Sequence, residues 1–337
     1  MWLVVVLNTR TPEYPNTIIT RIRSVDMNPL FRRVAMFKYV LTAALGLVTA
    51  FLISGCSHRS LAAALHAHES FDEGAPSSQS TDASTFDKTV SATGVRTVKV
   101  GVGVGSAKIT AEGSDGIKVH AVRKYSGNPD SAARKLISEC RVDINTSGST
   151  VEIKDFVPEA LKNENKVKNL RLEMEVRVPA GLSVESDIGV GGTSLDGRFA
   201  SIKVGSGVGD VVLKGESGSA EIGEGVGVVH ANDLRCTGDR LSVHSGTGDI
   251  DLALSQTPRG ELKVDTGVGK IAVAVPADAR ANANLSTGVG SCKSDFPLNS
   301  PKRAIGDVSE RMDGQINGGG APITLKSGVG EVTLKKR

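Results

Sequence analysis

The sequence has few aromatic residues, few cysteines and little net charge. Phe, Trp and Tyr make up 4% of its 337 residues, and the single tryptophan is Trp2. Four cysteines are too few for a small fold held together mainly by disulfides. One long apolar run is present, which excludes a protein that crosses a membrane many times. Glycine, with 39 residues, is abundant instead, and this composition favours a regularly repeated structure over an ordinary mixed core.

The net charge of +3 belongs to the start of the chain. Residues 1–55 hold six basic and two acidic side chains, so the remaining residues hold 34 basic and 35 acidic ones, a net charge of −1. A near-neutral chain without a basic stripe has no electrostatic footprint for nucleic acid. We therefore predict no nucleic-acid partner.

An export signal precedes Cys56. Its apolar run, residues 40–53, is shorter than the roughly 20 residues that a membrane span needs, and basic residues precede it. The run Ile53-Ser54-Gly55-Cys56 resembles a bacterial lipobox, in which the cysteine is acylated and becomes the mature N-terminus. We predict a lipid-anchored protein of the cell envelope, sorted to the outer membrane because Ser57 follows the cysteine. An ordinary membrane anchor with a free cysteine is the alternative.

The chain divides into three parts. Residues 1–55 are the signal peptide with an upstream segment, and Met1, Met27 and Met36 are all possible starts. Residues 56–85 are rich in Ser, Ala, Asp, Glu and His, which is typical of a flexible linker. Residues 86–337 form the predicted strand-repeat domain.

A Gly-x-Gly triplet recurs along this domain at intervals of 18, 18, 21, 21, 21 and 40 residues. Apolar residues alternate with polar ones on both sides of each triplet, which is the pattern of strands. Units of this length cannot bury an apolar face alone and must stack. We predict an all-β fold: a single parallel β-solenoid of about eight coils, with glycines at corners that permit positive φ. The corners begin at Gly189, Gly207, Gly225, Gly246, Gly267, Gly288 and Gly328.

Two further features bear on this fold. An antiparallel sandwich or meander of hairpins is the alternative, but it would favour Asn-Gly or Asp-Gly turns over these triplets. Residues 128–140 predict a short helix with Asn128 or Asp130 as its cap. We expect this helix-bearing region to cap the N-terminal end of the solenoid, and Lys335–Arg337 to place charge at the far edge.

The repeats resemble a bacterial putative-adhesin family of domains of unknown function, described as β-strand-repeat proteins. The resemblance is carried by residues 318–334, with Ser327-Gly-Val-Gly-Glu-Val-Thr-Leu334 at their end, and by the Val-Pro-Ala runs that begin at Val178 and Val275. It covers about residues 86–337 and implies a cell-envelope location and a β-solenoid. Relatives usually have Ser or Asn between the two glycines, whereas this chain mostly has Val.

The valines between the glycines are the main candidate for a functional surface. In the triplet that begins at Gly246, Thr247 takes the place of the valine. They either pack inward or form an exposed apolar stripe, which would be a contact surface for self-association or for a partner. The six are Val190, Val208, Val226, Val268, Val289 and Val329.

Other candidate sites are weaker. A nucleotide site would need a helix after the glycines, and a strand follows each triplet. Asp210 and Asp249 are placed as in calcium-binding turns, but Lys270, Ser291 and Glu331 interrupt the column. No spacing gives His120, His230 or His244 a catalytic partner. We therefore predict no cofactor, no metal site and no catalytic residue.

Three cysteines remain besides Cys56. We predict that Cys236 and Cys292 are buried free thiols, and leave open a disulfide between Cys140 and either of them. The predicted function is a non-catalytic binding, adhesion or scaffold surface held at the membrane by its lipid. Its partner would be an envelope protein, a polysaccharide or a second copy. The alternative is a polysaccharide-binding or polysaccharide-cleaving β-helix enzyme.

Overall fold

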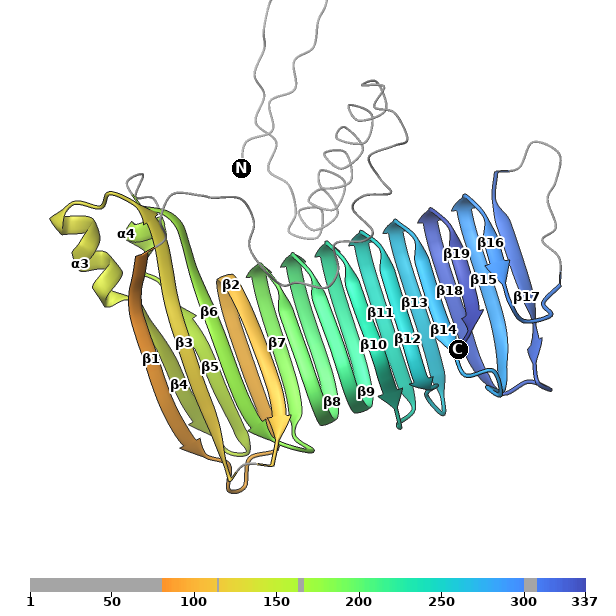
Figure 1. Cartoon of the computed structure of the whole chain (residues 1–337), viewed down its shortest axis with the longest axis horizontal. Coiled ribbons are helices and arrows are strands. Elements are labelled where there is room, and N and C mark those ends of the chain that lie inside the picture. The colour runs from red at the N-terminus through yellow and green to blue at the C-terminus, as the bar shows by residue number, and fades with distance from the viewer. Residues whose placement is uncertain (1–80, 114, 163–166, 300–307) are drawn as a thin grey trace, which may run out of the picture. The chain divides into compact units, whose positions relative to one another are not determined.

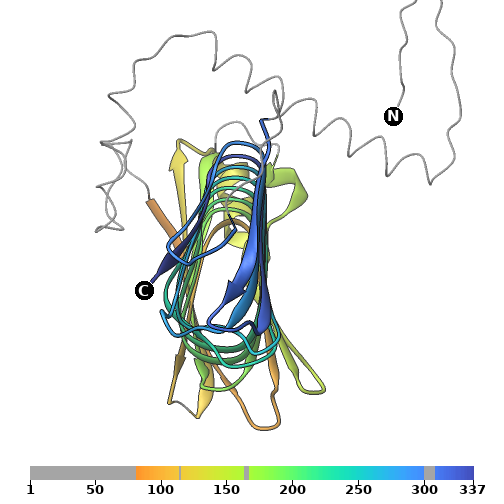
Figure 2. The same ribbon diagram turned by 90° about the vertical axis from the view of Figure 1, so that its right-hand side faces the viewer.

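The described strands line two walls that face each other (Figure 2). An apolar core lies between the walls. The computed structural model describes residues 81–113, 115–162, 167–299 and 308–337. These residues belong to one unit, Pro76–Arg337. The predicted signal peptide and most of the predicted linker lie outside the described residues.

The N-terminal part of the unit contains both described helices (Figure 1). Its elements are β1 (Thr81–Ser91), β2 (Thr97–Glu112), β3 (Gly116–Gly127), α3 (Ser131–Glu139), β4 (Arg141–Ser147), β5 (Thr150–Phe156), α4 (Glu159–Lys162) and β6 (Val167–Pro179).

The remainder of the described chain consists of strands. They are β7 (Ser183–Val190), β8 (Thr193–Val208), β9 (Val211–Val226), β10 (Val229–Cys236), β11 (Arg240–Thr247), β12 (Ile250–Gln256), β13 (Glu261–Val268), β14 (Ile271–Val275), β15 (Ala281–Val289), β16 (Cys292–Ser294), β17 (Glu310–Ile316), β18 (Ala321–Val329) and β19 (Val332–Lys336).

The repeats build the walls by parallel pairing between successive coils. The first wall contains β7, the second halves of β8 and β9, then β11 and β13. The second wall contains the first halves of β8 and β9, then β10, β12 and β14. Equivalent residues of successive coils lie side by side, so the sequence repeat becomes a set of columns along the unit.

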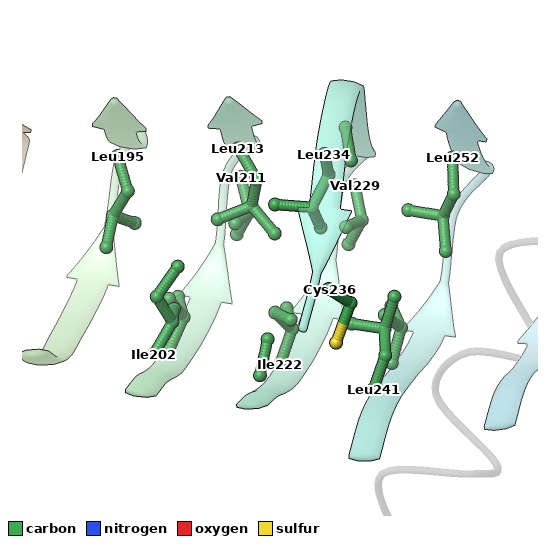
Figure 3. Close-up of a cluster of buried hydrophobic side chains, with 14 of the residues drawn as sticks. Leu195, Ile202, Val211, Leu213, Ile222, Val229, Leu234, Cys236, Leu241 and Leu252 are labelled. Carbon is green, nitrogen blue, oxygen red and sulfur yellow. The ribbon is translucent and has the colours of Figure 1, made fainter. Parts of the chain in front are cut away.

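The core lies between the walls and consists mainly of aliphatic side chains. Leu195, Leu213 and Leu252 point inward from the second wall, and Ile202 and Leu241 point inward from the first wall (Figure 3). All five are buried, because alternation along each strand sends every second side chain inward. The few aromatic residues of the sequence fit this narrow, aliphatic interior.

The glycine triplets carry the chain from the first wall into the second, and their two glycines serve different purposes. The second glycine has the positive φ, as at Gly248, where φ is 151°. The first has no positive φ but lies against the neighbouring coil: a Cβ on Gly207 would be 2.4 Å from the carbonyl oxygen of Gly189. The expected positive φ therefore falls on the glycine after the valine.

The predicted N-terminal helix forms, and it joins the two walls. Asp130 is its N-cap, and its carboxylate accepts a hydrogen bond from the amide of Ala133 at 2.9 Å. Helix α3 follows β3, which belongs to the second wall, and precedes β4, which belongs to the first. It therefore crosses between the walls at the N-terminal end. A small second cluster there buries Ile137, Cys140 and Leu161.

The prediction of an all-β fold is confirmed, but the sheet is mixed rather than purely parallel. Strands β1 and β3 pair antiparallel in the second wall, β4 pairs antiparallel with β5 in the first, and β17 pairs antiparallel with β15. The antiparallel strands lie at the two ends, where the glycine repeat is replaced by hairpins and helices. The prediction of a uniform run of about eight parallel coils therefore does not describe the ends.

The C-terminal coil is not the last one in space. Strand β18 lies between β13 and β15, and β19 lies between β14 and β16. The expectation that Lys335–Arg337 protect the far edge is wrong, because β19 runs inside the second wall. The reason is the excursion after β16: β17 turns back on β15, so these strands form the end and the final coil fills the place before them.

The corner geometry predicts different effects for two glycine substitutions. Gly248→Ala would place a Cβ 1.6 Å from the carbonyl oxygen of Gly227 at a positive φ. We expect it to lower the free energy of unfolding by more than about 2 kcal/mol. The measurement is chemical unfolding of the purified chain. Gly103→Ala is the control, because a Cβ there would meet nothing within 4 Å. Equal losses for both variants would contradict this reading of the corner.

Candidate interaction surface

The residue between the two glycines of each triplet points out of the corner. The predicted valines are 38–50% exposed, and Val104, which precedes them in another triplet, is 49% exposed. Inward packing, the alternative considered from the sequence, is therefore wrong. We call the exposed set the valine ladder: Val104, Val190, Val208, Val226, Val268, Val329 and Val289, with Thr247 in the same series.

Strand register places these residues next to one another. Val104 pairs with Val190, Val190 with Val208, and Val208 with Val226. Thr247 lies between Val226 and Val268, and Val329 lies between Val268 and Val289. Neighbouring positions are about 4.8 Å apart, the spacing of paired strands. The ladder thus has eight positions, and their order in space differs from their order in the sequence.

One member of the valine ladder, Val104, was not among the residues predicted from the sequence. Val104 stands in the triplet Gly103-Val104-Gly105, whose likeness to the later corners is visible in the sequence. It lies 86 residues before Val190 in the chain, so no regular interval links the two. Only the pairing of β2 with β7 shows that it begins the ladder.

Charged residues flank the ladder on both sides. Asp210 stands two residues after Val208, and Asp249 two after Thr247; they accept hydrogen bonds from the backbone amides of Val228 at 3.0 Å and Lys270 at 2.7 Å. These carboxylates therefore bind the neighbouring coil. The described residues contain no group of three or more His, Cys, Asp or Glu side chains placed to hold a metal ion.

A column of buried polar side chains runs beneath the ladder. The residue before each first glycine carries a hydroxyl at five positions: Ser206, Ser245, Thr266, Ser327 and Thr287. Three of these hydroxyls donate to the carbonyl of the second glycine in the neighbouring corner. Thr266 donates to Gly248 at 3.2 Å, Ser327 to Gly269 at 2.9 Å and Thr287 to Gly330 at 2.9 Å. The column thus ties adjacent corners together from inside.

Glu224 interrupts the column of hydroxyls. Its side chain is buried, with 3% of the residue exposed. The Ser245 hydroxyl donates to Oε2 at 3.0 Å, while Oε1 has no hydrogen-bond partner among the described residues. Burial raises the pKa of Glu224 above its usual value; the hydrogen bond from Ser245 opposes this, and the negative charge of Asp210 adds to it. In the sequence, this position is marked only by a single Glu in a series that, from Ser206 onward, otherwise has Ser or Thr before the first glycine.

The candidate histidines contact aspartate side chains, and the three described cysteines are buried. His120 Nδ1 lies 2.6 Å from a carboxylate oxygen of Asp87, and His244 contacts Asp265 in the same way, both at the surface. Cys140, Cys236 and Cys292 are buried free thiols, so the disulfide left open for Cys140 does not form. Burial, with the negative charge of Glu310, raises the pKa of the Cys292 thiol to about 11. Such a thiol is a poor nucleophile at neutral pH.

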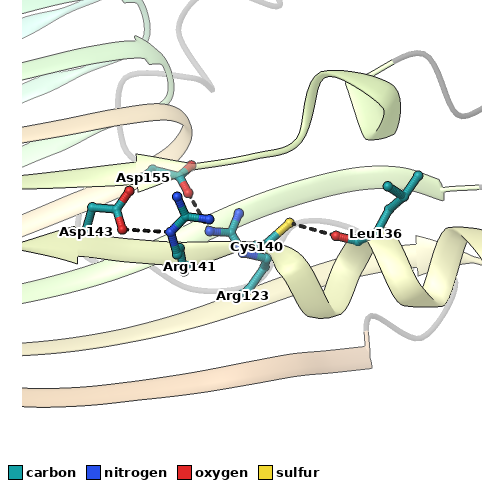
Figure 4. A network of polar contacts seen from close by, with 6 residues as sticks. All are labelled: Arg123, Leu136, Cys140, Arg141, Asp143 and Asp155. Atoms are coloured by element: carbon teal, nitrogen blue, oxygen red, sulfur yellow. Dashed lines mark hydrogen bonds and ion pairs between the residues drawn. The ribbon is translucent and has the colours of Figure 1, made fainter.

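A cleft of about 800 Å³ opens near the Val104 end of the ladder. Its lining includes Val104, Phe156 and Leu161, together with Arg123 and Asp155. The last two form a buried ion pair (Figure 4). The Asp155 carboxylate is thus already neutralised by a guanidinium. This cleft was not predicted from the sequence, because its residues come from elements that only the fold brings together.

One family model matches part of the chain. Residues 239–294 match the family described as the N-terminal domain of toast_rack, DUF2154. This segment contains three of the glycine corners. The resemblance to a family of domains of unknown function is therefore confirmed for these repeats. No curated protein matches the chain, and in the described part no helix is long and apolar enough to cross a bilayer.

Several solved structures are similar over most of their length. A putative cell adhesion protein from Clostridium sporogenes is 16% identical, with 75% of this chain and 99% of that chain covered, at a TM-score of 0.36. A putative adhesin from Bacteroides fragilis is 15% identical, with 74% and 97% covered, at 0.38. A putative lipid binding protein from Parabacteroides distasonis is 11% identical, with 75% and 96% covered, at 0.27. Similarities this low assign no partner to this chain.

The buried carboxyl predicts a pH-dependent stability. Because the folded state raises the pKa of Glu224, folding favours its protonated form, and stability falls as pH rises above the ordinary glutamate value. Glu224→Gln removes this ionisation. We expect it to raise the free energy of unfolding at pH 7 by about 1–2 kcal/mol and to flatten the pH dependence above pH 4.5. Urea unfolding from pH 4 to pH 8 is the measurement. An unchanged slope would contradict the assignment.

Proposed function

We propose that this chain is a lipid-anchored protein of the cell envelope whose strand-repeat domain is a non-catalytic surface for binding, adhesion or scaffolding. The observation that carries the proposal is the valine ladder. It places seven half-exposed valines in one line along a regular frame.

The corners do not need valine for their own stability. Thr247 occupies the same place in the series, and the members are half in water, so packing does not select an apolar residue. A contiguous exposed apolar surface is typical of a contact site. Burying the exposed half of one valine contributes roughly 1 kcal/mol, so a partner that covers several positions gains useful affinity.

The lipid anchor completes the proposal. Cys56 precedes Thr81 by 25 residues, a length that reaches at most about 80 Å when fully extended. The domain would thus act close to the membrane that holds the lipid, which Ser57 favours as the outer membrane. Its partner would be an envelope protein, a polysaccharide or a second copy, and no nucleic acid.

The alternative, a polysaccharide-binding or polysaccharide-cleaving enzyme, has less support. Sugar sites generally use exposed aromatic rings and carboxyl groups free to transfer protons. Here Phe199 and Phe296 are buried in the core, and Arg141 stacks over Phe156 at 3.8 Å. In the cleft, Asp155 is held by Arg123. These contacts favour the non-catalytic reading.

Substitution of the ladder tests the proposed surface. We expect Val208→Ser, Val226→Ser and Val268→Ser together to remove complexes trapped by chemical crosslinking of the full chain in intact cells. Thermal unfolding would change little, because these side chains are already half exposed. A variant with Val212→Ser and Val308→Ser, outside the ladder, is the control. Unchanged crosslinking in the ladder variant would refute the contact surface, and strong destabilisation would show that the valines serve packing instead.

Substitution of Cys56 tests the anchor. We expect Cys56→Ala to lose acyl labelling and to leave the outer-membrane fraction. The reason is that the acyl chains on Cys56 would be the attachment of this protein to the membrane. Fractionation and metabolic labelling with a fatty acid are the measurements. Ser57→Ala, which leaves the cysteine in place, is the control. Retention of the label in Cys56→Ala would contradict lipid attachment at this residue.

A further inference from the structure

The spacing of the valine ladder limits what can cover it efficiently. Its eight positions repeat at about 4.8 Å, the distance between paired strands. A surface that covers the whole ladder needs apolar groups at the same spacing along a similar length. A second copy of the ladder has both, so its valines can contact those of the first along the whole length.

Two ladders can face each other about a closed twofold axis whether they run in the same or in opposite directions. When they run in opposite directions, the first position faces the last, so Val208 lies near Val268 of the second copy and Val226 near Thr247.

The flanking charges agree with this register. Asp187 stands three residues before Val190, at the second position, and Lys326 stands three before Val329, at the seventh. Asp210 follows Val208, at the third position, and Lys270 follows Val268, at the sixth. All four are exposed. In the antiparallel register each aspartate faces a lysine of the other copy, and the twofold axis repeats both pairs.

Neighbouring registers lose this agreement. A shift by one position in one direction brings Asp187 opposite Asp265 and Asp210 opposite Asp249. A shift in the other direction brings Asp210 opposite Glu331. Like charges facing each other across an interface are unfavourable and act against these arrangements.

We propose that two copies of this chain associate through their valine ladders, antiparallel and face to face, with Asp187 opposite Lys326 and Asp210 opposite Lys270. This inference rests on the proposed function, because it names the partner of the same contact surface. The half-exposed valines supply the apolar centre, and the charged columns supply the register.

A charge exchange tests both the association and its direction. The full chain, solubilised in detergent, is followed by sedimentation velocity over a range of concentrations. We expect Asp187→Lys alone, and Lys326→Asp alone, to weaken the dimer by at least about tenfold. The double variant, and an equal mixture of the two single variants, should return to within about threefold of the wild type. Asp278→Lys, in the loop between β14 and β15, changes the charge equally and is the control.

Other results would overturn the proposal. A monomeric wild type refutes the dimer. If only Lys326→Asp weakens the dimer and the double variant stays weak, the ladders run in the same direction, where Lys326 would face Glu331. Oxidative crosslinking gives an independent check: Val208→Cys should link to Val268→Cys in a mixture and not to itself.

Failure of this inference is distinguishable from failure of the proposed function. A monomeric wild type whose crosslinks in cells still depend on the ladder valines would bind another envelope component through the same surface. Crosslinks that do not depend on the ladder would refute the surface itself.

Discussion

The close approach of neighbouring backbones at the glycine corners is the constraint on which the rest of this structure depends. In the repeated corners, a Cβ on the second glycine would lie 1.6–2.0 Å from the carbonyl oxygen of the next corner, and one on the first glycine 2.4–2.6 Å. No side chain fits there. The residue between them is the only one of the three that can carry a side chain, and the corner directs it outward. Exposure of the valine ladder thus follows from the packing of the backbone beneath it.

The same constraint shapes the interior of the corner. Where two coils approach this closely, the carbonyls of the glycines need donors from within, and the buried hydroxyls of Thr266 and Ser327 supply them. Glu224 and Ser206 depart from this pattern, each with one buried side-chain oxygen that lacks a partner among the described residues. The corner therefore has three layers: valine side chains on the solvent side, glycine backbone beneath them, and mainly hydroxyl side chains in the interior.

Much of this architecture was predictable from the sequence, because the repeat is local. Period-two alternation around each triplet predicted the strands, and Asp130 was among the predicted caps of α3. The order of coils was not predictable, because Val329 follows Val289 in the chain but precedes it in space, and only long-range pairing decides this. The direction of the valines was left open for a similar reason: alternation breaks at a corner. The ion pair of Arg123 and Asp155 joins strands with no common repeat.

The insertion of the final coil has a consequence for how the domain is made. Strands β18 and β19 follow β13–β16 in the chain, yet they lie between β13–β14 and β15–β16. Before β18 and β19 pair, β15 has no parallel neighbour, and β13 and β14 each have one unpaired edge. A chain that emerges from the ribosome N-terminus first therefore cannot complete this fold coil by coil, and a chain that lacks β18 and β19 keeps an open edge in the middle of the domain.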